Sequence, residues 1–233
     1  SSGRMTDCVS PVADKLRIDC SLVTYNGAMA RGRKSESRDI IYHNPLPPEY
    51  GDKLIDYCVE KRFHLNYYIN DILYAQEAKL LKKYAMIYSQ QTGAKFHFLK
   101  DIKKLKGNTP TKLILITDPS NEDKSRTRDF QYEHFSKAAC GKLKLFKTNP
   151  EYLEFLNRDA DKGIGLRKLS EFYGIKRESI IAFGDGENDI EMLEFAGMGV
   201  ALSNAGDKVK DRADYITDHD NNEAGVARVL SEL

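Results

Sequence analysis

The sequence predicts an α/β fold, in which a core with a parallel sheet carries an inserted α+β module. Helical and strand patterns alternate from Asp161 to the end of the chain, and this order builds right-handed crossovers and a parallel sheet. Within it, residues 180–183 form a short, bulky apolar run bounded by turn formers, as in a strand buried on both faces. The length of 233 residues lies near the size at which chains divide into domains.

The first part of the chain contains one clear strand, at residues 21–25, which the turn at Asn26 and Gly27 closes. Prolines then interrupt the chain at positions 45, 47 and 48. We therefore expect a first core segment over residues 1–45.

The middle of the chain, residues 46–156, is predicted to be a self-contained α+β module inserted in the core. Its expected helices cover residues 49–62, 77–91 and 123–139, and its expected strands cover residues 63–69, 112–117, 142–148 and 152–156. The last two strands return the chain to the core, which continues over residues 157–233.

The helix after Asp161 has clear start and stop signals, because Asp161 is a good N-cap and Gly174 a good C-terminal stop. Lys162 then falls in the first turn, where a cation opposes the helix dipole and has no stabilising role by position alone. With an anion bound, the lysine and the free backbone N–H groups would act on it together.

Composition excludes several classes of function. The chain has 36 basic and 35 acidic residues and a net charge of +1, so we expect no nucleic-acid and no membrane partner. No apolar run approaches the roughly 20 residues of a membrane span, and no signal peptide is recognisable. The four cysteines show no Cys-x-x-Cys pairing, which favours reduced thiols and a cytoplasmic location.

The most informative segment is residues 184–189, with the sequence Gly-Asp-Gly-Glu-Asn-Asp. Asp185 would lie at the carboxyl end of the buried strand, where open α/β sheets bind ligands, and Asn188 and Asp189 would lie in the first turn of the next helix. Mg²⁺ suits such a site because it takes one or two carboxylates and keeps waters or phosphate oxygens. The alternative is a loop whose acidic residues only stabilise a helix N-terminus.

Residues 184–189 resemble the fourth motif of haloacid dehalogenase-like phosphatases of the Cof type, which carry an α/β cap on a Rossmann-like core. The resemblance extends in order over nearly the whole chain. It includes residues 2–4 (second motif, usually Thr-Gly-Arg), 26–28 (Asn-Gly-Ala turn), 161–163 (third motif), 199–205, 213–217 and 225–227.

One departure from the family is the absence of its nucleophile, the first Asp of an Asp-x-Asp-Gly-Thr motif on the first strand. Residues 1–3 either belong to the second motif or are left from an expression tag. We expect the core to be incomplete at the N-terminus and the nucleophile to lie upstream of Ser1, on the same chain or on a separate fragment. Three other aspartates could be mistaken for the nucleophile, but the residues that follow them do not match the motif. They are Asp118, Asp159 and Asp218.

The resemblance implies a Mg²⁺-dependent phosphatase that hydrolyses a small phosphorylated metabolite, such as a sugar phosphate, through an aspartyl phosphate. Asp185 would ligate Mg²⁺, and Asp189 would do so directly or through a water. Asn188 and Ser2 would hydrogen-bond the phosphoryl group, and Lys162 would offset its charge.

Gly3, Arg4 and Asn26 are weaker candidates for the substrate-binding crevice. Two other classes of function stay open. A non-catalytic protein that binds a phosphate ligand would keep the metal and phosphate residues, and a phosphomutase of similar fold would pass the phosphoryl group to a second sugar hydroxyl.

Overall fold

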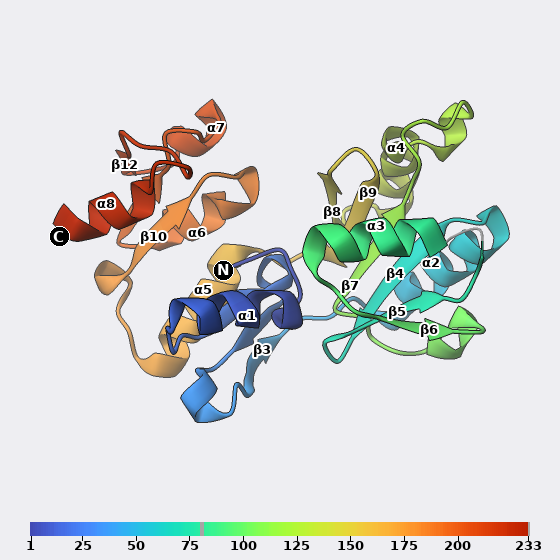
Figure 1. Cartoon of the computed structure of the whole chain (residues 1–233), viewed down its shortest axis with the longest axis horizontal. Coiled ribbons are helices and arrows are strands. Elements are labelled where there is room, and N and C mark those ends of the chain that lie inside the picture. Colours follow the sequence, from blue (N-terminus) through green and yellow to red (C-terminus); the bar gives the residue numbers. More distant parts are fainter. Residues whose placement is uncertain (80–81, 233) are drawn as a thin grey trace. The chain divides into compact units, whose positions relative to one another are not determined.

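The computed structural model describes residues 1–79 and 82–232 and divides the chain into two compact units (Figure 1). The first unit comprises Ser1–Gly3, Asp19–Tyr42 and Asp161–Leu233, and the second comprises Arg4–Ile18 and His43–Ala160. The division expected from the sequence, at residues 1–45, 46–156 and 157–233, differs from this one mainly in residues 4–18.

The first unit contains a parallel sheet in the order β10-β11-β12. Its strands are β10 (Ile181–Gly184), β11 (Met198–Ala201) and β12 (Tyr215–Ile216), and its helices are α5 (Lys162–Tyr173), α6 (Ile190–Phe195), α7 (Asp207–Lys210) and α8 (Gly225–Glu232). Helices and strands alternate along the chain, which confirms the predicted α/β fold class. Met192 and Leu193 of α6 pack with Ala182, Ala201 and Val209 in the core of this sheet.

A small three-stranded sheet has the strands β1 (Leu22–Thr24), β2 (Met29–Arg31) and β3 (Ile40–His43) in sequence order, with β1 and β2 antiparallel. Its residues lie in the first unit except His43, which groups with the second. The turn η1 (Tyr25–Gly27) joins β1 to β2. Val23, Ala30 and Leu169 form a small core here, so α5 packs on β1 and β2.

The second unit contains a six-stranded mixed sheet in the order β6-β5-β4-β7-β9-β8. Its strands are β4 (His64–Ile69), β5 (Ile72–Gln76), β6 (Phe96–Leu99), β7 (Lys112–Ile116), β8 (Leu143–Thr148) and β9 (Tyr152–Asn157). Only β5 and β6 pair in parallel among the described neighbours.

The helices of the second unit are α1 (Thr6–Leu16), α2 (Pro48–Lys61), α3 (Lys82–Thr92) and α4 (Arg128–Ala139). Leu54 and Ile55 of α2 and Ala139 of α4 join the apolar side chains of one sheet face in the main core. On the other face, Tyr68 of β4 donates a hydrogen bond to Tyr88 of α3. Helices therefore cover both faces of this sheet.

Two expected helices of the second unit differ in the structure. In the helix expected at residues 77–91, residues 77–79 are not helical and α3 begins at Lys82, while residues 80 and 81 lie outside the described part of the chain. The helix expected at 123–139 is divided into a 3-10 turn, Lys124–Arg126, and α4. Thr127 separates them because its hydroxyl accepts the Phe130 N–H and caps α4.

Within residues 1–79 and 82–232, no helix has the length and apolar character needed to cross a membrane.

Candidate functional site

The loop after β10 places Asp185 at the carboxyl end of the parallel sheet, where its side chain is exposed. Asn188 and Asp189 lie in a 3-10 turn, Glu187–Asp189, directly before α6 and not in its first α-helical turn. Gly184 is required for this path, because a Cβ on it would lie 2.5 Å from the Cβ of Asp189. The tight loop thus brings the end of the strand and the start of the helix together.

Asp189 organises this loop. Its Oδ2 accepts hydrogen bonds from the backbone N–H groups of Asp185, at 3.1 Å, and Gly186, at 3.0 Å. Its Oδ1 lies 2.5 Å from the Lys162 ammonium nitrogen. Both carboxylate oxygens therefore have protein partners, so Asp189 is placed to orient the loop and the lysine.

Lys162 begins α5, and Asp161 caps the helix by accepting the Ile164 N–H at 2.7 Å. The Lys162 side chain is buried and paired with Asp189. By position alone Lys162 is unfavourable in the helix dipole, and the carboxylate of Asp189, which is distant in the sequence, compensates for this position.

The Asn26 turn connects this loop to the start of the chain. Tyr25, Asn26 and Gly27 all have positive φ angles, 53°, 52° and 90°, a region favoured by glycine and asparagine. Asn26 Oδ1 accepts a hydrogen bond from Asn188 Nδ2 at 2.9 Å. Its backbone N–H donates to the Ser2 carbonyl at 3.1 Å, so one hydrogen-bonded chain links Ser2, Asn26 and Asn188.

The structure thus brings together seven of the eight predicted site residues within the first unit. These are Ser2, Gly3, Asn26, Lys162, Asp185, Asn188 and Asp189, and Gly3 lies so close to Asn26 that a Cβ on it would be 2.7 Å from Asn26 Oδ1. Arg4 groups with the second unit, so the structure does not place it with the others.

A cleft of about 490 Å³ lies at this site, and Lys162, Asp185 and Asp189 line it. Its walls continue along β10 through Ile181 and Phe183. Among the described residues, β10 pairs with β11 and with no strand on its other side. The cleft therefore combines a polar end with an apolar wall along an open sheet edge.

Asn204 is a further residue at the site that sequence reasoning missed. It follows β11, and its Nδ2 donates to Asp185 Oδ2 at 2.9 Å. Its position just beyond the carboxyl end of a neighbouring parallel strand is the signal that could have identified it.

The oxygen ligands at this site are few. In the described part of the chain, no group of three or more His, Cys, Asp or Glu side chains could hold a metal ion. Asp185 nevertheless offers an exposed carboxylate with one oxygen hydrogen-bonded to Asn204 and no described partner on the other. This fits Mg²⁺, which takes one or two protein carboxylates and completes its shell with waters and substrate phosphate.

The three aspartates that imitate the nucleophile motif do not line the cleft. Asp118, in the second unit, accepts hydrogen bonds from Ser120 and Tyr84 and pairs with Lys83. Asp159, also in that unit, and Asp218, after β12, are exposed.

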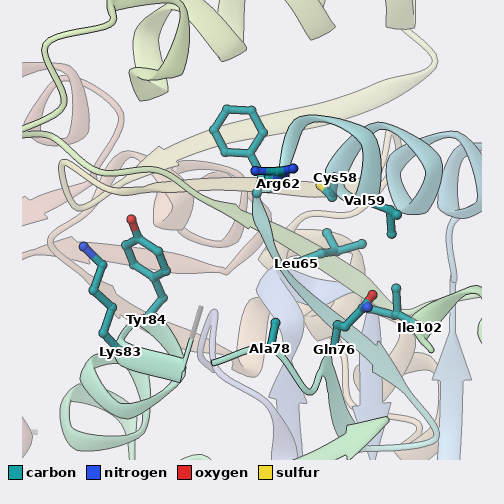
Figure 2. Close-up of a pocket in the computed structure, with 10 residues that line it drawn as sticks. Cys58, Val59, Arg62, Leu65, Gln76, Ala78, Lys83, Tyr84 and Ile102 are labelled. Carbon is teal, nitrogen blue, oxygen red and sulfur yellow. The ribbon is translucent and has the colours of Figure 1, made fainter. Parts of the chain in front are cut away.

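A separate cavity of about 380 Å³ lies in the second unit, below the end of α2 and beside the start of α3 (Figure 2). Its lining includes the apolar Leu65 and, as polar groups, Arg62, Gln76, Lys83 and Tyr84. None of the predicted site residues belongs to it. The charge of Lys83 is already matched by Asp118, 3.1 Å away.

The α/β core gathers a lysine, an amide and a carboxylate at the carboxyl edge of a parallel sheet. This arrangement defines the class of enzyme site that binds an anion and a cation together. The chain belongs to the haloacid dehalogenase-like hydrolases, because the sequence model of that family matches residues 1–230. The predicted family is therefore confirmed.

Individual relatives agree with this assignment. The chain is 30% identical over 235 residues to the 5-amino-6-(5-phospho-D-ribitylamino)uracil phosphatase YitU of Bacillus subtilis, and the match covers 100% of this chain and 83% of YitU. A putative phosphatase of the same organism, YxeH, is 27% identical over 91% of this chain and 75% of its own length. The predicted class of enzyme, a phosphoric monoester hydrolase, is confirmed by these relatives.

Solved structures also match the whole chain. The crystal structure of TM0651 from Thermotoga maritima has a TM-score of 0.83 and 32% identity, covering 100% of this chain and 83% of that one. A haloacid dehalogenase-like hydrolase from Bacteroides thetaiotaomicron has a TM-score of 0.84 and 29% identity, covering 100% and 84%.

Proposed function

We propose that this protein is a Mg²⁺-dependent phosphatase that hydrolyses a small phosphomonoester through an aspartyl-phosphate intermediate. The observation that carries the proposal is the pairing of Lys162 with Asp189, which holds a buried ammonium group beside the loop that presents Asp185. Phosphoryl transfer needs little covalent chemistry from the protein beyond a nucleophile, and it depends on positioning and on neutralising charge.

Each residue has a defined task in this proposal. The Lys162 ammonium group neutralises charge on the transferring phosphoryl group, and the Asn188 amide and the Ser2 hydroxyl donate hydrogen bonds to its oxygens. Asp185 binds Mg²⁺, and a bound Mg²⁺ would supply further charge neutralisation. Asp189 holds Lys162 and the loop in place. Asn26 accepts a hydrogen bond from the Asn188 amide, and Gly3 lies against Asn26.

The nucleophile is proposed to be an aspartate on a strand that fills the cleft and pairs with the open edge of β10. The unpaired backbone groups of an open strand edge favour pairing with a further strand, and the apolar side chains of Val23, Ile181 and Phe183 line the same cleft. The segment expected upstream of Ser1, whether continuous with the chain or a separate fragment, would supply such a strand.

The substrate class is proposed to be sugar phosphates and related phosphorylated polyols. The name of the relative YitU specifies a phosphorylated ribitylamino compound as its substrate, which makes this compound the first to be tested. A cytoplasmic location is also proposed, because the four cysteines of the chain are free.

A non-catalytic phosphate-binding protein is the second candidate. It is favoured by one observation: the aspartates that line the cleft, Asp185 and Asp189, already have other tasks, and no other described aspartate lines it.

Phosphate release from a panel of phosphomonoesters, with Mg²⁺ and with a chelator, separates these candidates. Chelator-sensitive turnover and an acid-stable phosphorylated aspartate on a peptide mapped by mass spectrometry support the phosphatase. Tight binding of a phosphomonoester without release, in protein that mass spectrometry shows to be intact, supports the binding protein. Recovery of an isomeric sugar phosphate would identify a phosphomutase.

A further inference from the structure

We infer that Asn204 is a positioning residue that engages one oxygen of Asp185, presents the other to a cation and thereby makes the site prefer Mg²⁺ over Ca²⁺. This inference rests on the proposed function, in which Asp185 binds the cation. It assigns a task to a residue outside the group of predicted site residues.

The orientation of the Asn204 amide is determined by its two hydrogen bonds. Its Oδ1 accepts the backbone N–H of Asn221 at 3.2 Å, and its Nδ2 donates to Asp185 Oδ2 at 2.9 Å. A backbone N–H can only donate and a carboxylate can only accept. The amide oxygen must therefore face Asn221, and the amide nitrogen must face Asp185.

The backbone around Asn204 is anchored independently of any cation. Leu202 donates its N–H to the carbonyl of Gly184 at 3.0 Å, and Ser203 donates its N–H to Thr217 Oγ1 at 3.1 Å. Thr217 is buried. The segment is thus fixed to the ends of both β10 and β12, and the Asn204 side chain needs little ordering when a cation binds.

The consequence for Asp185 is that Oδ2 already accepts the Asn204 amide, whereas Oδ1 has no described partner and is the more available oxygen for a cation. Mg²⁺ requires near-octahedral geometry and accepts single oxygens from carboxylates, whereas Ca²⁺ takes six to eight oxygens and commonly binds a carboxylate through both. A carboxylate that presents mainly one oxygen suits the smaller ion. Hydrogen-bond partners of ligating carboxylates also support affinity, and their loss commonly costs about 10- to 100-fold.

The test is isothermal titration of the purified protein with MgCl₂ and with CaCl₂, comparing wild type, Asn204→Ala and Asn221→Ala. Asn204→Ala should weaken Mg²⁺ binding by about 10-fold or more and Ca²⁺ binding by less, so that the Mg²⁺/Ca²⁺ affinity ratio falls. Asn221→Ala is the matched control, because it keeps the backbone N–H that orients Asn204, and it should retain the wild-type ratio.

A second variant, Asn204→Asp, preserves the shape and the acceptor for Asn221 but cannot donate to Asp185. Its added charge should strengthen both ions, and Ca²⁺ more, so the ratio should fall here too. A wild-type ratio in both Asn204 variants, or an equal loss for the two ions in Asn204→Ala, would overturn the inference.

The variant Asp185→Asn distinguishes this failure from failure of the proposed function. If Asp185→Asn leaves Mg²⁺ affinity unchanged, the metal assignment itself is wrong. If Asp185→Asn abolishes Mg²⁺ binding while both Asn204 variants keep the wild-type ratio, only the role of Asn204 is wrong.

Discussion

Lys162 and Asp189 form a buried ion pair that joins the first turn of α5 to the loop after β10, with Lys162 Nζ 2.5 Å from Asp189 Oδ1. Each side chain is less than one tenth exposed. Asp189 also accepts the N–H groups of Asp185 and Gly186 through its other oxygen. The pair is therefore part of the framework of the site as well as a source of positive charge in it.

Replacing Lys162 by Met should destabilise the protein and weaken phosphate binding together. Removal of one partner of a buried ion pair commonly costs about 3–5 kcal/mol, and we expect a value near the lower end, about 3 kcal/mol, because Asp189 keeps two backbone donors. Urea unfolding measures the stability, and titration with inorganic phosphate measures the binding.

The double variant Lys162→Met with Asp189→Asn provides the control for this prediction. It removes both charges, so it should recover part of the stability lost in Lys162→Met. The single variant Asp189→Asn completes the comparison. If the stability lost in the double variant equals the sum of the losses in the two single variants, the two side chains do not stabilise each other.

Asp185→Asn should abolish Mg²⁺ binding and leave the fold intact. The side chain is exposed and makes one side-chain hydrogen bond, to Asn204, so the change in stability should stay within about 0.5 kcal/mol. Loss of one negative charge from a site for a hard cation should lower affinity strongly. Calorimetric titration and thermal unfolding measure the two effects.

Asp207→Asn is the matched control, since Asp207 is an exposed aspartate of the same unit, in α7. It should bind Mg²⁺ as the wild type does. Equal weakening in both variants would point to general electrostatics of the surface and against a metal-ligating role of Asp185.

Local sequence signals predicted the parallel part of the first unit well. The N-cap at Asp161 and the left-handed stop at Gly174 are both present at the ends of α5. The apolar run expected at residues 180–183 is β10, displaced by one residue. The site could be predicted because its residues follow strands whose carboxyl ends share one edge, a relationship that topology determines.

The parts that were missed depend on contacts distant in the sequence or on weak local patterns. Lys162 and Asp189, which form an ion pair, are 27 positions apart in the sequence. Asn26 and Asn188, which share a hydrogen bond, are 162 positions apart. In β5, apolar residues occupy both faces, so alternation gave no strand signal, and the hairpin before it turns through Asn70 and Asp71 in left-handed conformations. Helix α1 contains Pro11, which disfavours a helix prediction.

Gly27→Ala should unfold the first unit at much lower denaturant concentration. Gly27 has a φ of 90°, and a Cβ on it would lie 1.7 Å from the carbonyl oxygen of Asp161. The left-handed backbone and the overlap with backbone atoms should together cost more than about 3 kcal/mol. Urea unfolding followed by circular dichroism measures this cost.

Gly174→Ala separates the two contributions, because Gly174 also has a positive φ, 64°, and a Cβ on it would meet nothing within 4 Å. This control should cost only about 1 kcal/mol, the conformational penalty for alanine in the left-handed region. If the two variants lose the same stability, the close approach of the Asn26 turn to α5 is not a tight constraint.

Asp118→Asn should keep full phosphatase activity and change how stability depends on pH. Hydrogen bonds from Ser120, and then the pairing with Lys83, lower the pKa of Asp118 to about 2, from an ordinary value of 3.8. Because the pKa is lowered on folding, the carboxylate stabilises the folded state above the ordinary value, and this contribution is lost as the pH falls toward 2. The variant should therefore be less stable than wild type near neutral pH, and the difference should shrink below about pH 4 and vanish near pH 2. Unfolding in urea across this range measures the difference, and phosphate release near neutral pH measures activity.

Activity lost in a stably folded Asp118→Asn protein would instead make Asp118 a candidate for the nucleophile. It would then remove the need for an aspartate on a strand in the cleft beside β10.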